Sequence, residues 1–398
     1  MMPPISKRQF LKIFSAGSVG GIGGFFAGSR ATDMFRSPTA ARTPAPAVGG
    51  ASAPIDSVAI VAHETPWTMK LLSYATQSFQ QVCFVPLREN VQQGGTAPTA
   101  PQGVTVLRGD DKFTQLLSRK PQGVLTFGFQ FGTDLAGLDP ADHPRVVMLM
   151  SKTSLDHHQA TSDEAKAALS GVQVISFWHS RLKRPDSYHG VGQSMVRVMD
   201  KIGAGSDRFV VVAGYGNTGK GIARYLQQHG YEVGVVDTDP VEILLAQHDG
   251  FEAGLMQAFA GRADVVIDAT DGLGTVLDAP TADAFRGPTV TVLSSSSDDT
   301  AIQIADGYVN ASGTRFIVHA SGGMANMHHG VGGNDDQSMM LTGYSGIHTL
   351  RNFPNIATDP IPDNPYVTQL SAATEREIAA SAIKDAASAT GNPLMPTQ

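Results

Sequence analysis

The sequence predicts an α/β protein of two domains, each built on a mostly parallel sheet. Short apolar runs alternate along the chain with segments of helical spacing, which is the pattern of βαβ units. The 398 residues are enough for two or three domains, and one such series lies on each side of about residue 190. With 41% apolar and 16% charged residues, the chain is not disordered throughout.

Composition excludes several classes of protein. The single cysteine, Cys83, excludes an intrachain disulfide framework and a cysteine-based metal centre within one chain. The formal net charge is −7 and no basic stripe is present, so nucleic acid is not an expected partner. No apolar run reaches the roughly 18 residues of a spanning helix, so we expect no integral membrane span.

Residues 1–31 predict an export signal. The charged segment 6–12 precedes a weakly apolar, Gly-rich stretch over 13–28. Its order, Ser-Lys-Arg-x-Phe-Leu-Lys, resembles a twin-arginine signal in which Lys7 replaces the first arginine, and an ordinary secretory signal or an irregular N-terminus is the alternative. The twin-arginine machinery carries folded proteins, so we expect a periplasmic or secreted protein. Residues 32–54 form a Pro/Ala/Gly linker.

Residues 55–190 predict an α/β substrate domain, which we expect residues 331–398 to complete. His63 follows the first strand, where a substrate loop is expected, although it could equally be a surface histidine. Strands are predicted at 57–62, 82–87, 104–107, 123–127, 145–150 and 172–177, and helices at 68–80, 112–117 and 162–169.

The strongest signal in the chain lies in residues 191–330. An apolar strand at 208–213 runs into Gly214-Tyr-Gly216-Asn-Thr-Gly219, and a helix and a second strand follow. Gly214 permits the tight turn, Gly216 lets the backbone approach a pyrophosphate, and Gly219 lets the helix pack closely. The N-terminus of that helix offers N–H groups to the phosphates.

Asp237 ends the second of these strands, roughly 20 residues after Gly214, where an acid can bind ribose hydroxyls and repel a 2′-phosphate. NAD is therefore favoured over NADP, and 191–330 is predicted to be a Rossmann-type doubly wound parallel sheet. A Gly-rich turn without a ligand is the alternative. Further strands are predicted at 263–270, 289–293 and 315–319. Because ligands lie beyond the carboxyl ends of parallel strands, Thr270, Ser294–Ser297 and Asn326 should face the cofactor cleft. For the serine run, a solvated loop is the alternative.

Four stretches carry a resemblance to a known family. VVVAGYGNTGKGIARYLQQHGYEVGVVDTDP, DVVIDATDG and RFIVHASGGMANM resemble the cofactor domain of the S-adenosylhomocysteine hydrolase family, and VQVISFWHSRLKRPDSYHGVGQSM resembles the segment that joins its two domains. The resemblance covers about 172–326, whereas 55–171 match in order and outline only. NAD-dependent 2-hydroxyacid dehydrogenases share the architecture, but Gly-Tyr-Gly-x-x-Gly-Lys-Gly favours the hydrolase family.

The resemblance implies a chemistry in which NAD is regenerated within each turnover. Bound NAD⁺ would oxidise a ribose 3′-hydroxyl, a base would remove the acidified neighbouring hydrogen, and the 5′ group would leave by elimination. Water would then add, and NADH would reduce the ketone again. The resemblance also implies a homo-oligomer.

Individual residues carry this resemblance. Lys183 matches the lysine beside the substrate hydroxyl if one residue is deleted, and Asp186 matches the aspartate that follows it. A lysine beside a carboxylate and a cationic nicotinamide can act as a general base, although a solvated basic turn with Arg181 and Arg184 is the alternative. For the cofactor, the matching positions are Gly214, Gly216, Asn217, Thr218 and Gly219 in the phosphate loop, Asp237 at the ribose, Thr270 near the nicotinamide and Asn326 at the carboxamide.

Other positions depart from the family. Ser297 stands where the family has a catalytic histidine, and a later histidine aligns with Gly333, although His328 and His329 are near enough to serve as acid or base. The family's substrate-binding acids in the first domain and its basic, tyrosine-bearing C-terminal tail have no counterpart. Adjacent histidines do not share a helix face, so no metal site is expected.

Three hypotheses follow. The chain is a redox-neutral hydrolase or lyase for a nucleoside-like or sugar-like small molecule, a dehydrogenase with net hydride transfer, or a non-catalytic NAD-binding protein.

The export hypothesis predicts that residues 1–31 fused to a reporter export it only when the reporter is folded. The double variant K7Q/R8Q should abolish that export, because the twin-arginine machinery recognises the basic pair. Undiminished export of the double variant, measured by fractionation, would contradict the assignment.

Overall fold

The computed structural model describes residues 53–87, 99–128, 137–151, 154–155, 158–159, 161–169, 171–270, 274–296, 300–319, 325, 336–362 and 364–390. The predicted export signal and residues 32–52 of the predicted linker lie outside this set. No helix among the described residues is long and apolar enough to cross a membrane.

The first sheet has eight strands in the order β13-β14-β6-β5-β4-β1-β2-β3. Every neighbouring pair is parallel except β13 and β14, which are antiparallel at one edge. The six predicted strands of residues 57–177 are present, whereas no strand was predicted in the C-terminal segment that supplies β13 and β14. The bounds are β1 Ser57–Ala62, β2 Gln81–Pro86, β3 Val104–Val106, β4 Gly123–Thr126, β5 Val146–Leu149, β6 Gln173–Ser176, β13 Thr358–Ile361 and β14 Asn364–Leu370.

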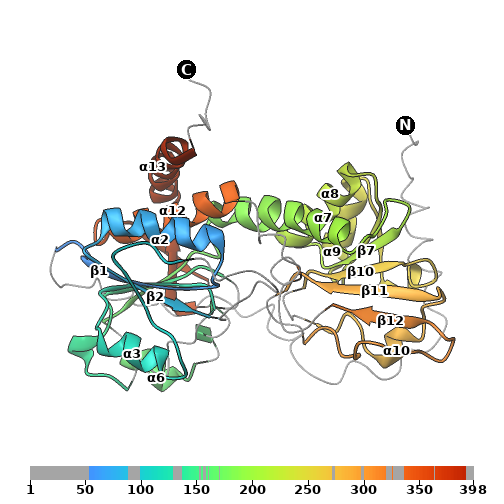
Figure 1. Ribbon diagram of the computed structural model, residues 1–398, viewed down its shortest axis with the longest axis horizontal. Helices are drawn as coiled ribbons and strands as arrows, with labels where there is room; N and C mark the ends of the chain where they lie inside the picture. Colours follow the sequence, from blue (N-terminus) through green and yellow to red (C-terminus); the bar gives the residue numbers. More distant parts are fainter. Residues whose placement is uncertain are drawn as a thin grey trace, which may run out of the picture. The chain divides into compact units, whose positions relative to one another are not determined.

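Helices cover both faces of this sheet. Helices α2 (Pro66–Ser78) and α12 (Asp336–Asn352) lie on one face, and α3 (Lys112–Ser118) and α6 (Asp163–Ala168) lie on the other (Figure 1). Helix α13 (Ala372–Thr390) packs against α12. A separate apolar cluster fills each face. Because both faces are covered, the strands are continuous apolar runs rather than alternating ones.

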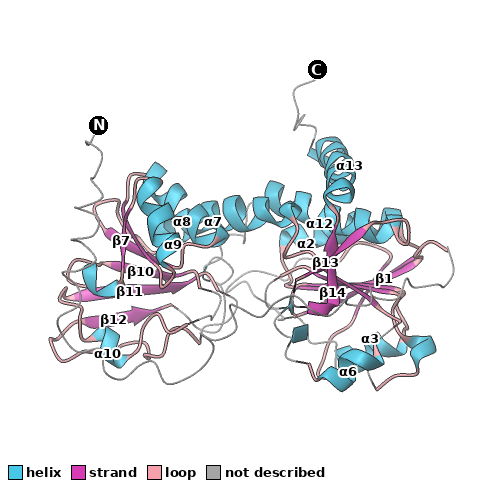
Figure 2. Ribbon diagram, turned by 180° about the vertical axis from the view of Figure 1, so that it is seen from behind, coloured by secondary structure: helices cyan, strands magenta, loops and turns pink. Residues whose placement is uncertain are grey.

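The second sheet has six strands, all parallel, in the order β12-β11-β10-β7-β8-β9. Figure 2 shows these strands with helices on either side. The predicted fold class, α/β with doubly wound parallel sheets, is confirmed. The bounds are β7 Phe209–Ala213, β8 Glu232–Val236, β9 Glu252–Gly254, β10 Val265–Asp268, β11 Thr289–Ser294 and β12 Arg315–Val318.

The helices of this lobe include one that begins inside the glycine motif. Helix α8 starts at Asn217, so the second half of the motif forms the first turn of the helix. The helices of this lobe are α7 Val191–Lys201, α8 Asn217–Gln228, α9 Pro240–His248 and α10 Ala279–Ala282, with the short turn η4 Met256–Ala258. In the first lobe η1 Pro140–Asp142 precedes β5, and η2 Arg181–Lys183 and η3 Asp186–Gly190 lie between β6 and α7.

Each sheet has one point at which the strand order reverses. In the first sheet this point lies between β1 and β4, and in the second between β7 and β10. Ligands of doubly wound sheets bind at the carboxyl ends of the strands on either side of such a point. The two edges therefore locate the cofactor site and a candidate substrate site.

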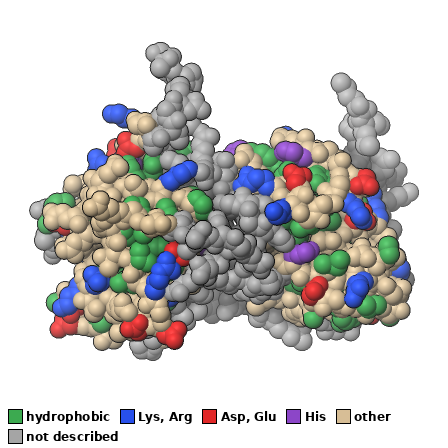
Figure 3. All heavy atoms as spheres, viewed as in Figure 1, with side chains coloured by type: hydrophobic (Ala, Val, Ile, Leu, Met, Phe, Trp, Pro, Cys, Tyr) green, Lys and Arg blue, Asp and Glu red, His purple; other side chains and the backbone are tan. Residues whose placement is uncertain are grey.

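Charged side chains of both signs are interspersed on the face of the molecule that Figure 3 shows.

Candidate functional site

The glycine loop after β7 has a conformation that other residues could not adopt. Gly214 has φ of +96°, and a Cβ there would lie 2.8 Å from the Ala269 carbonyl oxygen. A Cβ on Gly219 would lie 1.9 Å from the Gly214 carbonyl oxygen, so α8 can approach β7 only because position 219 has no side chain. Both glycines therefore have the structural roles that the motif predicts.

A cavity of about 640 Å³ opens in front of this loop. A Cβ on Gly216 would have no atom within 4 Å, so the loop leaves space at the point where a pyrophosphate would approach. No side chain caps α8 at Gly216, which leaves its first N–H groups for a bound anion. The residues present therefore fit NAD. The lining includes Ala213, Gly214, Gly216, Asn217, Thr218, Val236, Asp237, Thr238, Leu255, Met256, Gln257, Ala269, Thr270, Gly274, Thr275, Val276 and Thr281.

Asp237 lies in the cavity wall directly after β8, with its carboxylate fixed by the backbone. Its Oδ2 accepts from the Tyr215 N–H at 2.7 Å, and its Oδ1 accepts from the Asp239 N–H at 2.8 Å. A carboxylate oxygen has two acceptor positions, so each oxygen can also bind a ribose hydroxyl. The Asp237 carboxylate is thus held in one orientation at the cavity wall, and its role at the ribose stays a prediction.

Tyr215, between the two glycines of the loop, anchors the loop from below. Its side chain is 1% exposed, packs edge-on against Phe251, and donates from its hydroxyl to Asp249 Oδ2 at 2.8 Å. Burial, followed by the hydrogen bond and charge of Asp249, raises the pKa of this hydroxyl. The sequence alone did not predict this role of Tyr215, because its partner Asp249 lies at the end of α9, which only the fold brings beside the loop.

Of the polar residues at the ends of β10 and β11, only Thr270 of the described ones lines the cavity. This position agrees with the prediction for Thr270. Ser294, Ser295 and Ser296 are buried and bond one another or Asp268, so the solvated-loop alternative is wrong for them, although they do not line the cavity. Ser297 and Asn326 lie outside the described residues.

Lys183 and Asp186 form a buried ion pair. Lys183 is 8% exposed and Asp186 is 1% exposed, and Lys183 Nζ donates to Asp186 Oδ2. Arg181 and Arg184, by contrast, are exposed. The interpretation of this segment as a solvated basic turn is therefore wrong for Lys183, because its neighbours in sequence point to solvent while it points inward.

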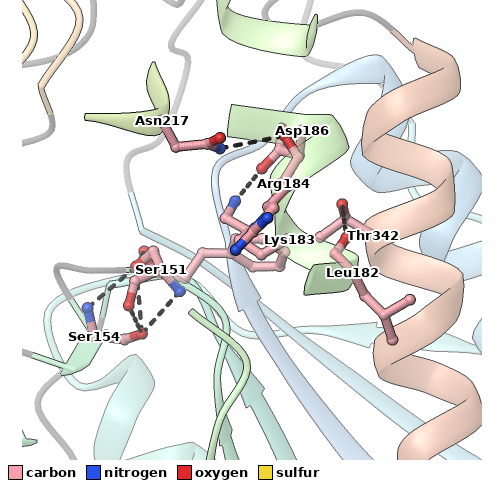
Figure 4. Close-up of polar contacts among 9 residues, drawn as sticks. Ser151, Ser154, Leu182, Lys183, Arg184, Asp186, Asn217 and Thr342 are labelled. Atoms are coloured by element: carbon pink, nitrogen blue, oxygen red, sulfur yellow. Dashed lines mark hydrogen bonds and ion pairs between the residues drawn. The ribbon is translucent and has the colours of Figure 1, made fainter. Parts of the chain in front are cut away.

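The segment that bears this pair is joined directly to the cofactor helix. Asn217, the first residue of α8, donates from its side chain to the Arg184 carbonyl oxygen at 3.4 Å (Figure 4). Asp186 opens η3, a π-helical turn of the kind that is frequent at functional sites. A Cβ on Gly221 of α8 would lie 2.0 Å from the Tyr188 carbonyl oxygen, so the turn and the helix touch backbone to backbone.

Lys183 also faces the reversal point of the first sheet. Its Nζ lies 5.9 Å from the ring centroid of Phe127, the residue that follows β4. Ser151, after β5, donates from its hydroxyl to the Phe127 carbonyl oxygen at 2.7 Å. Thr342 of α12 bonds the Leu182 carbonyl oxygen at 3.2 Å, which fixes the turn from the opposite side (Figure 4).

A second buried charge at this edge was not predicted from the sequence. Glu64, 2% exposed, follows β1 and binds Arg108 through both carboxylate oxygens. Bidentate pairs of this kind fix a guanidinium in one orientation. The sequence contains a signal for Glu64, because this residue lies two positions after a strand at the reversal point, next to His63. Trp178, which follows β6 and lines the cofactor cavity, was also missed.

The histidines have different environments. His63 follows β1, and its carbonyl oxygen accepts from the Thr68 hydroxyl at 2.6 Å. Burial, with a smaller contribution from Lys166, lowers the pKa of His158 to about 4, so this residue is neutral at pH 7. His157, His328 and His329 lie outside the described residues.

Within the described part of the chain, no group of three or more His, Cys, Asp or Glu side chains is arranged to hold a metal ion.

Comparison with known proteins supports the assignment of the cofactor segment. Residues 187–291 match the family model described as S-adenosyl-L-homocysteine hydrolase, NAD binding domain. The chain is 42% identical over 98 residues to adenosylhomocysteinase of Aeropyrum pernix, covering 24% of this chain and 23% of that protein. It is 34% identical over 95 residues to adenosylhomocysteinase of Corynebacterium diphtheriae, covering 23% and 20%. The chain thus matches less than a quarter of the length of these relatives.

Solved structures with a similar arrangement are more distant in sequence. A dipicolinate synthase structure from Bacillus halodurans gives a TM-score of 0.46 at 14% identity, covering 75% of this chain and 99% of that one. An L-alanine dehydrogenase gives 0.42 at 13% identity, covering 75% and 90%. For residues 187–291 the predicted resemblance is confirmed, and NAD is the cofactor. The other site assignments stay predictions.

Gly216→Val should yield a folded protein without NAD. A valine Cβ meets no protein atom within 4 Å, so the loop tolerates it, but the side chain occupies the space that the pyrophosphate needs. Thermal unfolding of the NAD-free form and mass spectrometry of released nucleotides test this. Gly261→Val, at another exposed glycine with no atom within 4 Å, is the matched control and should retain NAD; equal NAD content in both variants would contradict the assignment.

The fixed carboxylate of Asp237 should make the protein prefer NAD over NADP. A 2′-phosphate beside it would meet a like charge, worth roughly 2 kcal/mol or about 30-fold in Kd. Competitive titration of NAD-depleted protein with both nucleotides measures the ratio. Asp237→Asn should lower the ratio of the Kd for NADP to the Kd for NAD. Asp239→Asn, whose side chain can still cap α9, should leave this ratio unchanged. Equal affinities of the unaltered protein for NAD and NADP would contradict the assignment of Asp237 to the ribose.

Proposed function

We propose that this protein is an NAD-dependent enzyme that oxidises a substrate hydroxyl transiently and uses that oxidation for elimination or hydrolysis. The substrate class that we propose is a nucleoside-like or sugar-like small molecule. The observation that carries the proposal is the buried Lys183–Asp186 pair, attached through Asn217 and the η3 turn to the helix that binds the cofactor phosphates. A protein that only bound NAD would have no need for a buried lysine so placed.

Lys183 is the residue that we assign to move the hydroxyl proton. In the proposed step the substrate O–H proton passes to Lys183 Nζ, and Asp186 Oδ2 accepts the proton that Nζ donates. The C–H hydrogen leaves as hydride, for which bound NAD⁺ supplies the acceptor. The Phe127 ring beside Nζ excludes water from one side of the amine.

The substrate-binding acids of the adenosylhomocysteinase family have no counterpart in the sequence of the first domain. At the carboxyl edge of the first sheet the structure instead has a fixed Glu64–Arg108 ion pair, and Ser151 and Ser154 bond one another after β5. We therefore propose the chemistry of that family without proposing adenosylhomocysteine as the substrate. Export in the folded state with NAD already bound, and assembly into a homo-oligomer, belong to the same proposal.

A net dehydrogenase is the competing function, and the state of the cofactor separates the two. A redox-neutral enzyme retains its nucleotide, because each turnover restores NAD⁺. Denaturing the purified, extensively dialysed protein should therefore release about one NAD per chain. Release of none, together with turnover that depends on added NAD⁺, would favour the dehydrogenase.

Lys183→Met should retain NAD but lose the transient absorbance at about 340 nm that reports hydride transfer when adenosine or a methyl riboside is added. Loss of a general base costs about 10² to 10⁴ in rate, which a single-turnover experiment resolves easily. NAD retention is expected because the phosphate loop and Asp237 do not contact Lys183.

A second variant is needed, because removing the cationic partner of the buried Asp186 carboxylate costs about 3–5 kcal/mol. The double variant K183M/D186N removes both charges and should regain stability without regaining hydride transfer. Undiminished reduction of bound NAD in the folded double variant would remove Lys183 from the mechanism, and His328 or His329 would become the candidate base.

A further inference from the structure

Asp268, the last residue of β10, has a fully buried carboxylate at the edge of the cofactor site. Its exposure is 0%. A buried carboxylate is costly unless hydrogen-bond donors surround it. The mechanism proposed above does not use this residue.

The carboxylate is surrounded by donors. Oδ1 accepts from the Thr270 N–H at 2.9 Å and from the Thr270 hydroxyl at 2.7 Å, and Oδ2 accepts from the Ser294 hydroxyl at 3.0 Å. None of the ion pairs formed among the described residues includes Asp268. Its negative charge is therefore stabilised locally but not neutralised by a neighbouring cation.

Asp268 lies in the half of the sheet that we expect to bind the nicotinamide end of the dinucleotide. A doubly wound sheet binds one nucleotide on each side of its reversal point. Asp237, after β8, marks the half that takes the adenosine ribose, so the half formed by β10, β11 and β12 takes the nicotinamide nucleotide. Thr270, which lines the cavity, is bonded through two groups to Asp268.

We propose that Asp268 sets the reduction potential of the bound cofactor. The oxidised nicotinamide ring carries a positive charge, and the reduced ring is neutral after it accepts a hydride, that is, two electrons and one proton. A negative charge behind the ring stabilises the oxidised form more than the reduced form. It therefore lowers the potential of the bound couple and favours return of the hydride to an oxidised substrate. This inference depends on NAD binding and not on the reaction proposed above.

The test is a redox titration of the purified protein with its nucleotide bound, in which absorbance at about 340 nm reports the reduced fraction. Asp268→Asn has the same shape and keeps an acceptor for Thr270, but it removes the charge. We expect it to shift the preference toward NADH by about tenfold, because the cationic oxidised ring loses the attraction of a nearby negative charge. Tenfold corresponds to about 30 mV for this two-electron couple.

Two matched variants separate charge from structure. Asp264→Asn makes the same change just before β10, at the opposite end of the strand, and should leave the potential unchanged. Thr270→Val disturbs the same hydrogen bonds but keeps the charge, so it should weaken NAD⁺ and NADH binding equally. An Asp268→Asn potential equal to that of Asp264→Asn would overturn the proposal.

The unaltered protein provides a check that needs no variant to fold. Its bound couple should have a lower potential than free NAD⁺/NADH under the same conditions. A bound potential equal to or above the free value would overturn the proposal. Because no substrate is added, neither result depends on whether Lys183 is the base.

Discussion

The close contact between helix α8 and the π-helical turn η3 is the constraint on which the proposed site depends. The two backbones touch at Gly221 and Tyr188, where a single added Cβ would come within 2.0 Å of a carbonyl oxygen. Helix α8 is the helix to which we assign the cofactor phosphates, and η3 begins at Asp186. Any displacement of one element therefore moves the other, so the spacing between the phosphate site and the Lys183–Asp186 pair is fixed by backbone packing rather than by flexible side chains.

Buried charged residues lie at the carboxyl edges of both sheets, where we assign the cofactor site and the substrate site. Asp237 is fixed by two backbone N–H groups directly after β8, and Asp268 by one backbone N–H and two hydroxyls at the end of β10. Lys183 and Glu64 are each buried beside an oppositely charged partner at the other sheet. Such groups are expensive to bury, so their presence together at carboxyl edges is better explained by ligand chemistry than by stability.

The two lobes differ in how closely they match known proteins. Residues 187–291 match a family of NAD-binding domains, and the glycine loop has the geometry that this role requires. The first lobe has the same kind of sheet and the same kind of reversal point, but its edge residues are different from those that the resemblance led us to expect. Among proteins that bind the same cofactor, the residues of the cofactor site must fit the same ligand, whereas the residues of the substrate site differ when the substrates differ.

The sequence by itself determined the fold class, the cofactor and the positions of Gly214, Gly219 and Asp237. These features depend on local rules: strand and helix periodicity, the turn that a positive φ imposes, and a fixed spacing to the next strand end. Only the tertiary structure decided which charges are buried. Lys183 and its exposed neighbours Arg181 and Arg184 look alike in sequence, and Asp268 looks like any acid at the end of a strand. Burial depends on what packs against a side chain from distant parts of the chain, such as Thr342 above Leu182 or Ser294 beside Asp268, and no local pattern contains that information.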